Sequence, residues 1–113
     1  MAEEILIVYT SYPDAETARG IIRTLVEEQL IACGNLFPVV ESIYRWQGGV
    51  QVAGEVFGIL KTTRSCLSTL AARYRGLHPY EVPELVTVSV EDGLPSYLSW
   101  IEQNCPPPPD WQG

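Results

Sequence analysis

An almost unbroken apolar run opens the chain and covers residues 4–11. It is rich in β-branched and aromatic side chains and ends at residues 12–14 (Tyr-Pro-Asp), which predicts a strand buried on both faces. Apolar residues then recur over residues 15–26 as a single helical stripe, and Asp14 precedes the stripe as the expected N-cap. We therefore expect a helix that packs on a sheet and ends near residues 29–30.

Two long extended runs follow, residues 36–46 and 50–62, joined by Gln47-Gly48-Gly49. This turn sequence suits a tight hairpin with positive backbone angles. The first arm would reach roughly 36 Å, about twice the usual strand length. The sheet of one domain cannot pair all of it, so we expect the surplus to pack against another copy of the chain. Gly54 and Gly58 in the second arm predict a bulge or bend.

A second helical stripe begins at Ser65, contains Cys66 as a core residue, and is expected to end at Gly76. Residues 85–90 alternate in the manner of a final strand. After an Asp-Gly-Leu-Pro turn, residues 95–101 predict a short third helix with Pro95 in its first turn.

The order strand, helix, strand, strand, helix, strand, with a helix added at the end, indicates an α+β protein. This is the ferredoxin-like split βαβ arrangement with an antiparallel sheet. The arrangement hosts many activities, so it does not define a function. We divide the chain into a single domain, residues 1–105, and a proline-rich tail, residues 106–113.

Composition excludes several classes of protein. Seven basic and fourteen acidic residues give a net charge of −7, which opposes binding to nucleic acid. No apolar run is long enough to span a membrane, and the acidic start lacks the basic region of a secretory signal, so we expect a cytoplasmic protein. The three cysteines, Cys33, Cys66 and Cys105, include no C-x-x-C pair and do not suggest a disulfide framework.

Five short segments resemble the CutA-like divalent-cation tolerance proteins. They occur in that family's order and read ACGN at 32–35, SIYRWQG at 42–48, KT at 61–62, HPYEVPE at 78–84 and YLSWI at 97–101. The resemblance implies a homotrimer built like the PII signalling proteins, with strand edges paired between subunits. It also implies an association with copper or other divalent cations. The expected homotrimer agrees with the overlong hairpin.

The chain departs from the family's pattern at several positions. Gly34 stands where the family commonly has Val, and Gly49 stands where it commonly has Lys. The copper site proposed in some relatives uses a cysteine and paired histidines where this chain has Thr10, Leu77 and a single His78. The resemblance therefore implies an incomplete copper site.

The segment 78–84 is the main candidate for chemistry, because two prolines stiffen a loop that carries titratable groups. His78 is a metal ligand, a general base or a packing histidine. Cys33 is either a soft metal ligand or a small buried side chain. Glu81 and Glu84 should point to opposite sides of an extended segment, where they bind a hard cation or are simply solvated.

The remaining candidates would bind a small ligand. Lys61 either holds an anionic ligand at the start of the second helix or pairs with Glu55 or Glu84. Tyr44, Trp46 and Tyr80 line a cleft between subunits or form the core of an interface.

Three functions remain open at this stage. The first is a non-enzymatic trimer that binds divalent cations, such as copper, or a small ligand between subunits. The second is a small-molecule enzyme in the same cleft, with His78 as acid or base, Lys61 holding an anion and Tyr80 orienting the substrate. The third is a signalling or scaffolding trimer of the PII type. The chain lacks the common motifs of nucleophilic catalysis and phosphate binding.

Overall fold

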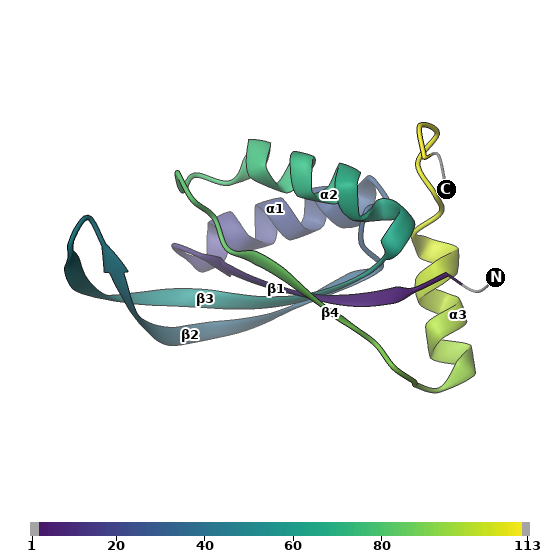
Figure 1. The fold of residues 1–113 in the computed structure, drawn as a ribbon, viewed down its shortest axis with the longest axis horizontal. Coiled ribbons are helices and arrows are strands. Elements are labelled where there is room, and N and C mark those ends of the chain that lie inside the picture. The colour runs from purple at the N-terminus through teal and green to yellow at the C-terminus, as the bar shows by residue number, and fades with distance from the viewer. Residues whose placement is uncertain (1–2, 112–113) are drawn as a thin grey trace.

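The computed structural model describes residues 3–111, and its elements follow the predicted order (Figure 1). The four strands form one antiparallel sheet in the order β2-β3-β1-β4. This confirms the α+β ferredoxin-like fold. Residues 1–2 of the predicted domain and residues 112–113 of the predicted tail lie outside the described residues. The elements are β1 (Ile5–Tyr12), α1 (Ala15–Glu27), β2 (Cys33–Trp46), β3 (Gly49–Thr63), α2 (Arg64–Leu77), β4 (Leu85–Ser89) and α3 (Pro95–Asn104).

Asp14 is the N-cap of α1, as predicted, and its carboxylate accepts the Thr17 N–H at 2.7 Å. The helix ends at Glu27, a little before the predicted residues. It stops there because Gln29 adopts a φ of 59°, a left-handed backbone conformation that turns the chain away from the helix axis.

The end of α2 differs from the prediction. The helix passes through Gly76 and ends at Leu77, and His78 is the C-cap with φ −82° and ψ 135°. A residue that precedes proline is forced into this extended conformation by the proline ring. Pro79, rather than Gly76, therefore ends the helix.

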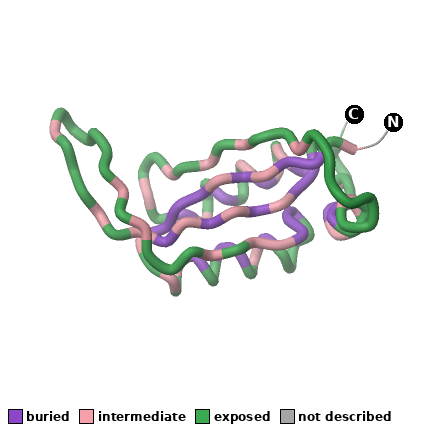
Figure 2. The backbone as a smooth tube through the Cα atoms, turned by 90° about the horizontal axis from the view of Figure 1, so that it is seen from below, coloured by how far each residue is buried: buried purple, intermediate pink, exposed green. Residues whose placement is uncertain are grey.

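The hairpin of β2 and β3 is longer than the rest of the sheet. β1 pairs with β3 only as far as Tyr12 opposite Val56, whereas β2 and β3 stay paired out to Trp46 opposite Gly49. Gln47 and Gly48 make the turn with φ values of 51° and 82°. We call the part of β2 and β3 beyond Val56 the arm. It projects from the body of the molecule and is mostly exposed along its length (Figures 1 and 2).

The predicted bulge lies on the other strand. The register shifts between Phe37 and Val40 of β2, not at Gly54 or Gly58 of β3. Residue 38 is a proline, which has no N–H to give to the ladder and therefore favours a break in pairing. Gly58 instead permits a close approach, because a Cβ there would lie 2.6 Å from the Thr10 hydroxyl.

Helices α1 and α2 cover one face of the sheet (Figure 1). Their buried side chains and the inward side chains of β1 and β3 form the main core. The opposite face of the sheet is not fully covered. On this face Ile7 and Tyr9 of β1 are half-buried, and Val86 and Val88 of β4 are exposed. The expectation of a first strand buried on both faces is therefore met on the helix side alone.

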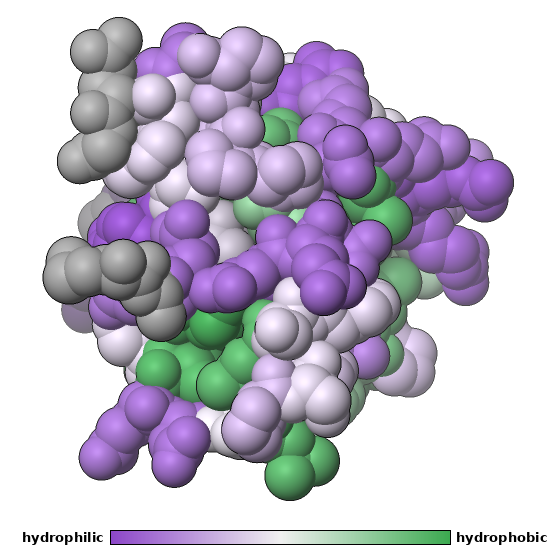
Figure 3. Space-filling view, turned by 90° about the vertical axis from the view of Figure 1, so that its right-hand side faces the viewer, coloured by the Kyte–Doolittle hydropathy of each residue, from purple (hydrophilic) through white to green (hydrophobic). Residues whose placement is uncertain are grey.

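Helix α3 packs at the end of the sheet opposite the arm, beside both termini (Figure 1). Pro95 occupies its first turn, as predicted, and Ile101 is its buried residue. Viewed from this end, hydrophobic and hydrophilic side chains alternate over the surface (Figure 3). Among residues 3–111, no helix is long and apolar enough to cross a membrane.

Candidate functional site

His78 is the centre of a buried polar and aromatic cluster beneath the loop that follows α2. Its side chain is 7% exposed. Nε2 lies 2.7 Å from the Ser11 carbonyl, and Nδ1 accepts the Tyr80 N–H at 3.1 Å. A carbonyl can only accept, so Nε2 carries the proton and the ring is the neutral Nε2–H tautomer. Both ring nitrogens are thus engaged inside the chain.

Three tyrosines surround this imidazole. The His78 ring stacks on Tyr12 with centroids 5.5 Å apart, and it lies 5.1 Å from the Tyr74 ring and 4.7 Å from the Tyr80 ring. We call these four side chains the tyrosine–histidine cluster. Tyr12 comes from the end of β1 and the other three from the last turn of α2 and the loop that follows it, so the cluster joins two segments far apart in sequence. In the single chain the imidazole is therefore packed among three aromatic rings.

Two of the tyrosine hydroxyls have partners. Tyr74 donates to the Glu84 carbonyl at 2.7 Å, and Tyr80 donates to the Glu55 carboxylate at 2.5 Å. Burial and, for Tyr80, the hydrogen bond to Glu55 raise the pKa of both phenols far above the usual value. Both hydroxyls therefore stay protonated in neutral solution.

The third hydroxyl, that of Tyr12, is fully buried and has no hydrogen-bond partner among the described residues. Burial raises its pKa to about 12. An orphaned buried hydroxyl is uncommon, because an unpaired polar group loses its bonds to water without replacement. Neither Tyr12 nor Tyr74 was singled out from the sequence, since each looks like an ordinary core aromatic there.

The glutamates of the loop flank this cluster at the surface. Glu81 and Glu84 are both exposed, and the Glu84 carboxylate accepts the Ser11 hydroxyl at 3.5 Å. Tyr44, on the arm, lies close enough to contribute to the raised pKa of Tyr80. Trp46 lies at the far end of the arm, opposite Gly49. The structure thus brings Tyr44 toward Tyr80 and Glu84 toward Ser11 and Tyr74.

Lys61 and Cys33 lie at the other end of the sheet. Lys61 pairs with Cys33 on one side and with Ile7 of β1 on the other. His78 instead contacts Ser11, four residues further along β1. Four strand residues correspond to about 13 Å. Cys33 and His78 of one chain therefore cannot bind the same ion. The Cys33 sulfur lies 3.9 Å from the Tyr97 hydroxyl.

The predicted pairing of Lys61 with a glutamate is not found among the described residues. Its ammonium group donates to the Asn35 side chain, and not to Glu55 or Glu84. The start of α2 is also occupied, because the Glu3 carboxylate accepts the backbone N–H and the hydroxyl of Ser65, each at 3.0 Å. The chain's own carboxylate takes the place that an anionic ligand would need. A lone glutamate before a strand gives no signal of this long-range cap.

A single chain does not supply a set of metal ligands. Within residues 3–111, no group of three or more His, Cys, Asp or Glu side chains gathers in a geometry suited to a metal ion. Both nitrogens of His78 are engaged, and a tight copper or zinc site normally requires several N or S ligands. The residues of one chain therefore do not fit such a site, and donors from another subunit would be needed.

These features define a small ferredoxin-like protein with a projecting two-stranded arm and no self-contained metal centre among its described residues. A family model described as CutA1 divalent ion tolerance protein matches residues 6–104. The divalent-cation tolerance protein CutA of Thermus thermophilus is 42% identical over 102 residues, which are 90% of this chain and 97% of that protein. The chain therefore belongs to the CutA1 divalent ion tolerance protein family.

Solved structures agree with this assignment. CutA from Xylella fastidiosa has a TM-score of 0.88 at 36% identity, covering 90% of this chain and 98% of that one. Some relatives are longer: Protein CutA of Mus musculus is 40% identical over 95 residues, which are 84% of this chain and 54% of that protein. The chain thus spans about half the length of this mouse relative.

Proposed function

We propose that the chain is the subunit of a non-enzymatic homotrimer that binds divalent cations, or a small ligand, in clefts between subunits. The observation that carries this proposal is the arm. Its strands have no third strand beside them in the described part of the chain, and its apolar side chains are uncovered there: Val50 is 65% exposed, Ile43 66% and Val52 62%. Exposed apolar surface of this kind is typical of an interface between chains.

The uncovered face of the sheet supports the same proposal. It carries Val86 and Val88 beside half-buried Ile7 and Tyr9, with which they share register positions. The arm and this face together give each subunit apolar surface that a closed ring of identical chains would bury. The edge strand β2 is also free to pair with a strand of a neighbour.

The cleft in this proposal lies where the arm of one subunit meets the tyrosine–histidine cluster. Tyr44, Trp46 and Tyr80 would supply aromatic walls, and Glu81 and Glu84 would supply carboxylates for a hard cation. His78 and Cys33 remain proposed ligands for copper or another soft cation, each completed by donors from a neighbouring subunit. Lys61, outside this cleft, remains a proposed contact for a small anionic ligand.

A cytoplasmic location is part of the proposal. Its support is the three free cysteines, which suit a reducing compartment. The family assignment supports a tolerance protein without enzymatic activity, and the engagement of both His78 nitrogens supports the same view, because neither is free to accept a substrate proton.

The oligomer is tested by sedimentation velocity at micromolar concentration. We expect a mass three times that of the chain. Ile43→Glu and Val52→Glu would place charges on the arm and should shift the distribution toward monomer. The matched control is Val26→Glu, which adds the same charge to an exposed valine on α1. A monomeric wild type, or trimers that persist in both arm variants, would count against the proposed interface.

Ligand binding is tested by titrating Cu²⁺, Zn²⁺ and a panel of anionic metabolites calorimetrically into the metal-free protein. Cation binding should weaken in Glu84→Gln and His78→Ala and stay unchanged in Glu91→Gln, an exposed carboxylate outside the loop. Cys33→Ser should weaken cation binding if the thiol is a ligand. Lys61→Gln should weaken the binding of an anionic metabolite if Lys61 contacts it. Equal binding to wild type and all four site variants would contradict the proposed ligands.

A further inference from the structure

Two thiols that are far apart in sequence meet in the second, smaller core. Cys66 lies in the first turn of α2 and Cys105 caps the end of α3, 39 positions later. Both are buried, at 0% and 1% exposure, in a cluster with Ile5, Ala32 and Ile101. The Cys66 sulfur lies 3.5 Å from the Cys105 carbonyl oxygen, so the two residues touch within this cluster. Contact between the two residues is the first condition for an intrachain disulfide.

The two thiols are not equivalent. The Cys105 thiol can donate to a Cys66 thiolate, which lowers the pKa of Cys66 to about 7 and raises that of Cys105 well above its usual value. The hydroxyls of Thr63 and Ser65 also lower the pKa of Cys66, whereas burial and the Glu3 carboxylate at the start of α2 act in the opposite direction. Cys66 is therefore the nucleophile of the pair and Cys105 is the second thiol that resolves the product.

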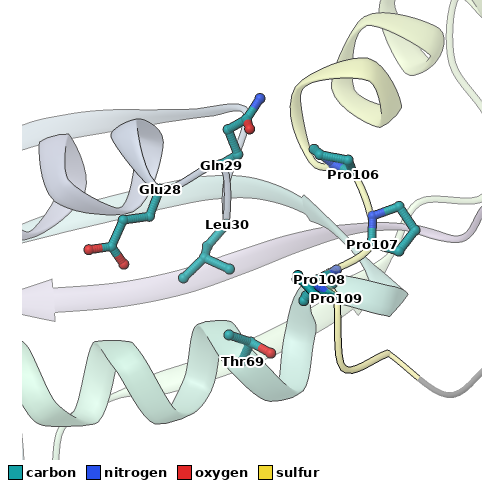
Figure 4. A pocket seen from close by; sticks show the side chains of 8 residues that line it. All are labelled: Glu28, Gln29, Leu30, Thr69, Pro106, Pro107, Pro108 and Pro109. Carbon is teal, nitrogen blue, oxygen red and sulfur yellow. The ribbon is translucent and has the colours of Figure 1, made fainter.

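A hollow of about 290 Å³ leads toward Cys66. It lies between the end of α1, helix α2 and the proline tail, as Figure 4 shows. Two of its lining residues, Gln29 and Pro106, also have carbonyl oxygens 3.9 Å and 3.4 Å from the Cys66 sulfur. The hollow is thus lined by two of the residues that cover the Cys66 sulfur.

We propose that Cys66 and Cys105 are a redox-sensitive pair that forms an intrachain disulfide when a hydroperoxide enters through this hollow. The Cys66 thiolate attacks the peroxide oxygen, the O–O bond breaks, and Cys66 becomes a sulfenic acid while the departing oxygen takes up a proton as water or alcohol. The Cys105 sulfur then attacks the Cys66 sulfur, its thiol proton passes to the sulfenic hydroxyl, the S–O bond breaks, the S–S bond forms and water leaves. Two thiols lose two electrons and two protons, and the peroxide gains both.

The disulfide would tie the start of α2 to the end of α3 and hold the base of the proline tail against the body. Such bonds in a reducing compartment are usually transient and serve sensing or catalysis. Cys33 is excluded from the pair, because it is half-exposed on β2 and contacts Tyr97 instead. The inference is independent of the proposed cation and ligand clefts.

The sequence makes the test unambiguous. Trypsin cleaves after Arg and Lys, so Cys33 falls in the peptide 24–45, Cys66 in 65–73 and Cys105 in 76–113. Native protein is treated with a stoichiometric amount of hydrogen peroxide, blocked with iodoacetamide and digested without reductant. We expect one cross-linked species, with the summed mass of 65–73 and 76–113 less two hydrogens, together with loss of two of the three titratable thiols. Dithiothreitol should restore both.

Matched variants separate the pair from the rest of the chain. Cys33→Ser should give the same cross-link as wild type, whereas Cys66→Ser and Cys105→Ser should give none. Cys105→Ser should instead leave Cys66 trapped as sulfenic acid, detectable with dimedone, with circular dichroism confirming that the variant is folded. Cross-links that contain the 24–45 peptide, or over-oxidised Cys66 without a link in the folded wild type, would overturn the proposal.

Discussion

The carboxylate of Glu3 caps helix α2 from across the molecule, accepting both the backbone N–H and the hydroxyl of Ser65 at 3.0 Å. The side chain of Thr63, the local N-cap residue, makes no capping hydrogen bond. Because the first N–H groups of a helix have no partner within it, a distant anion that satisfies one also complements the helix dipole. This contact joins the chain's start to the middle of its sequence.

Glu3→Ala should therefore lower the free energy of unfolding by about 0.5–2 kcal/mol, the range found for lost helix caps. Urea unfolding followed by circular dichroism measures the change. The control is Glu91→Ala, which removes an exposed carboxylate with no hydrogen bond among the described residues and should leave stability unaltered. Equal effects of the two substitutions would show that the cap contributes nothing.

Tyr12 and Tyr74 should respond oppositely to loss of their hydroxyls. Tyr74→Phe removes a hydrogen bond to the Glu84 carbonyl and should destabilise the fold by about 1 kcal/mol. Tyr12→Phe removes a buried hydroxyl that has no partner in the described part of the chain, so stability should stay constant or rise. Thermal unfolding of the two variants side by side decides this. A clear loss in Tyr12→Phe would reveal a partner such as an ordered water or a bound ligand.

The same tyrosines predict sensitivity to alkali. Burial raises the pKa of Tyr12 to about 12 and those of Tyr74 and Tyr80 further, whereas in the unfolded chain each phenol ionises near its ordinary value of about 10. A raised folded-state pKa gives stability that is complete below the unfolded value and is lost as the pH rises through the folded one. Stability should therefore fall above about pH 10.

Absorbance at 295 nm provides the measurement. The three phenols of the tyrosine–histidine cluster should ionise with unfolding rather than near pH 10, so the titration curve should show a delayed, cooperative phase. In a Tyr12→Phe variant the delayed amplitude should fall by a third of its wild-type size. A single smooth transition of all six phenols would contradict the burial of the cluster.

Gly34, where the family commonly has valine, occupies a tight space against α1. A Cβ at this position would lie 2.7 Å from the Ile22 Cγ2 and 2.9 Å from a Leu60 methyl group. Gly34→Ala should destabilise the fold by about 1–3 kcal/mol, because the stiff isoleucine must shift. Gly20→Ala, in α1 with open space around the glycine, should stabilise it by about 0.5–1 kcal/mol. Chemical denaturation of both variants gives the comparison, and a stabilised Gly34→Ala would show that this core repacks freely.

Much of the fold was predictable because its signals are local. Asp14 caps α1, Gln47 and Gly48 turn the hairpin, and Pro95 begins α3, each for reasons contained in a few neighbouring residues. The errors arose where two local signals competed. Gly76 looked like a helix stop, but Pro79 sets the end of α2 through the backbone of His78.

The candidate site was less predictable. The sequence drew attention to His78 and the loop around it. In the structure its ring is satisfied by Tyr80, a neighbour in sequence, and by Ser11, which lies 67 positions away and reaches the ring only in the folded chain. Lys61 illustrates the same limit, because its partner, Asn35, is supplied by strand pairing and not by sequence neighbours.

The sequence by itself determined the order of the elements, the surplus length of the hairpin and the family. Periodicity, turn residues and short motifs are properties of neighbouring residues, so they can be recognised without knowledge of the fold. Only the tertiary structure decided which distant groups meet: Glu3 with Ser65, and Cys66 with Cys105. These contacts depend on strand register and on the packing of helices against the sheet, so no local pattern encodes them.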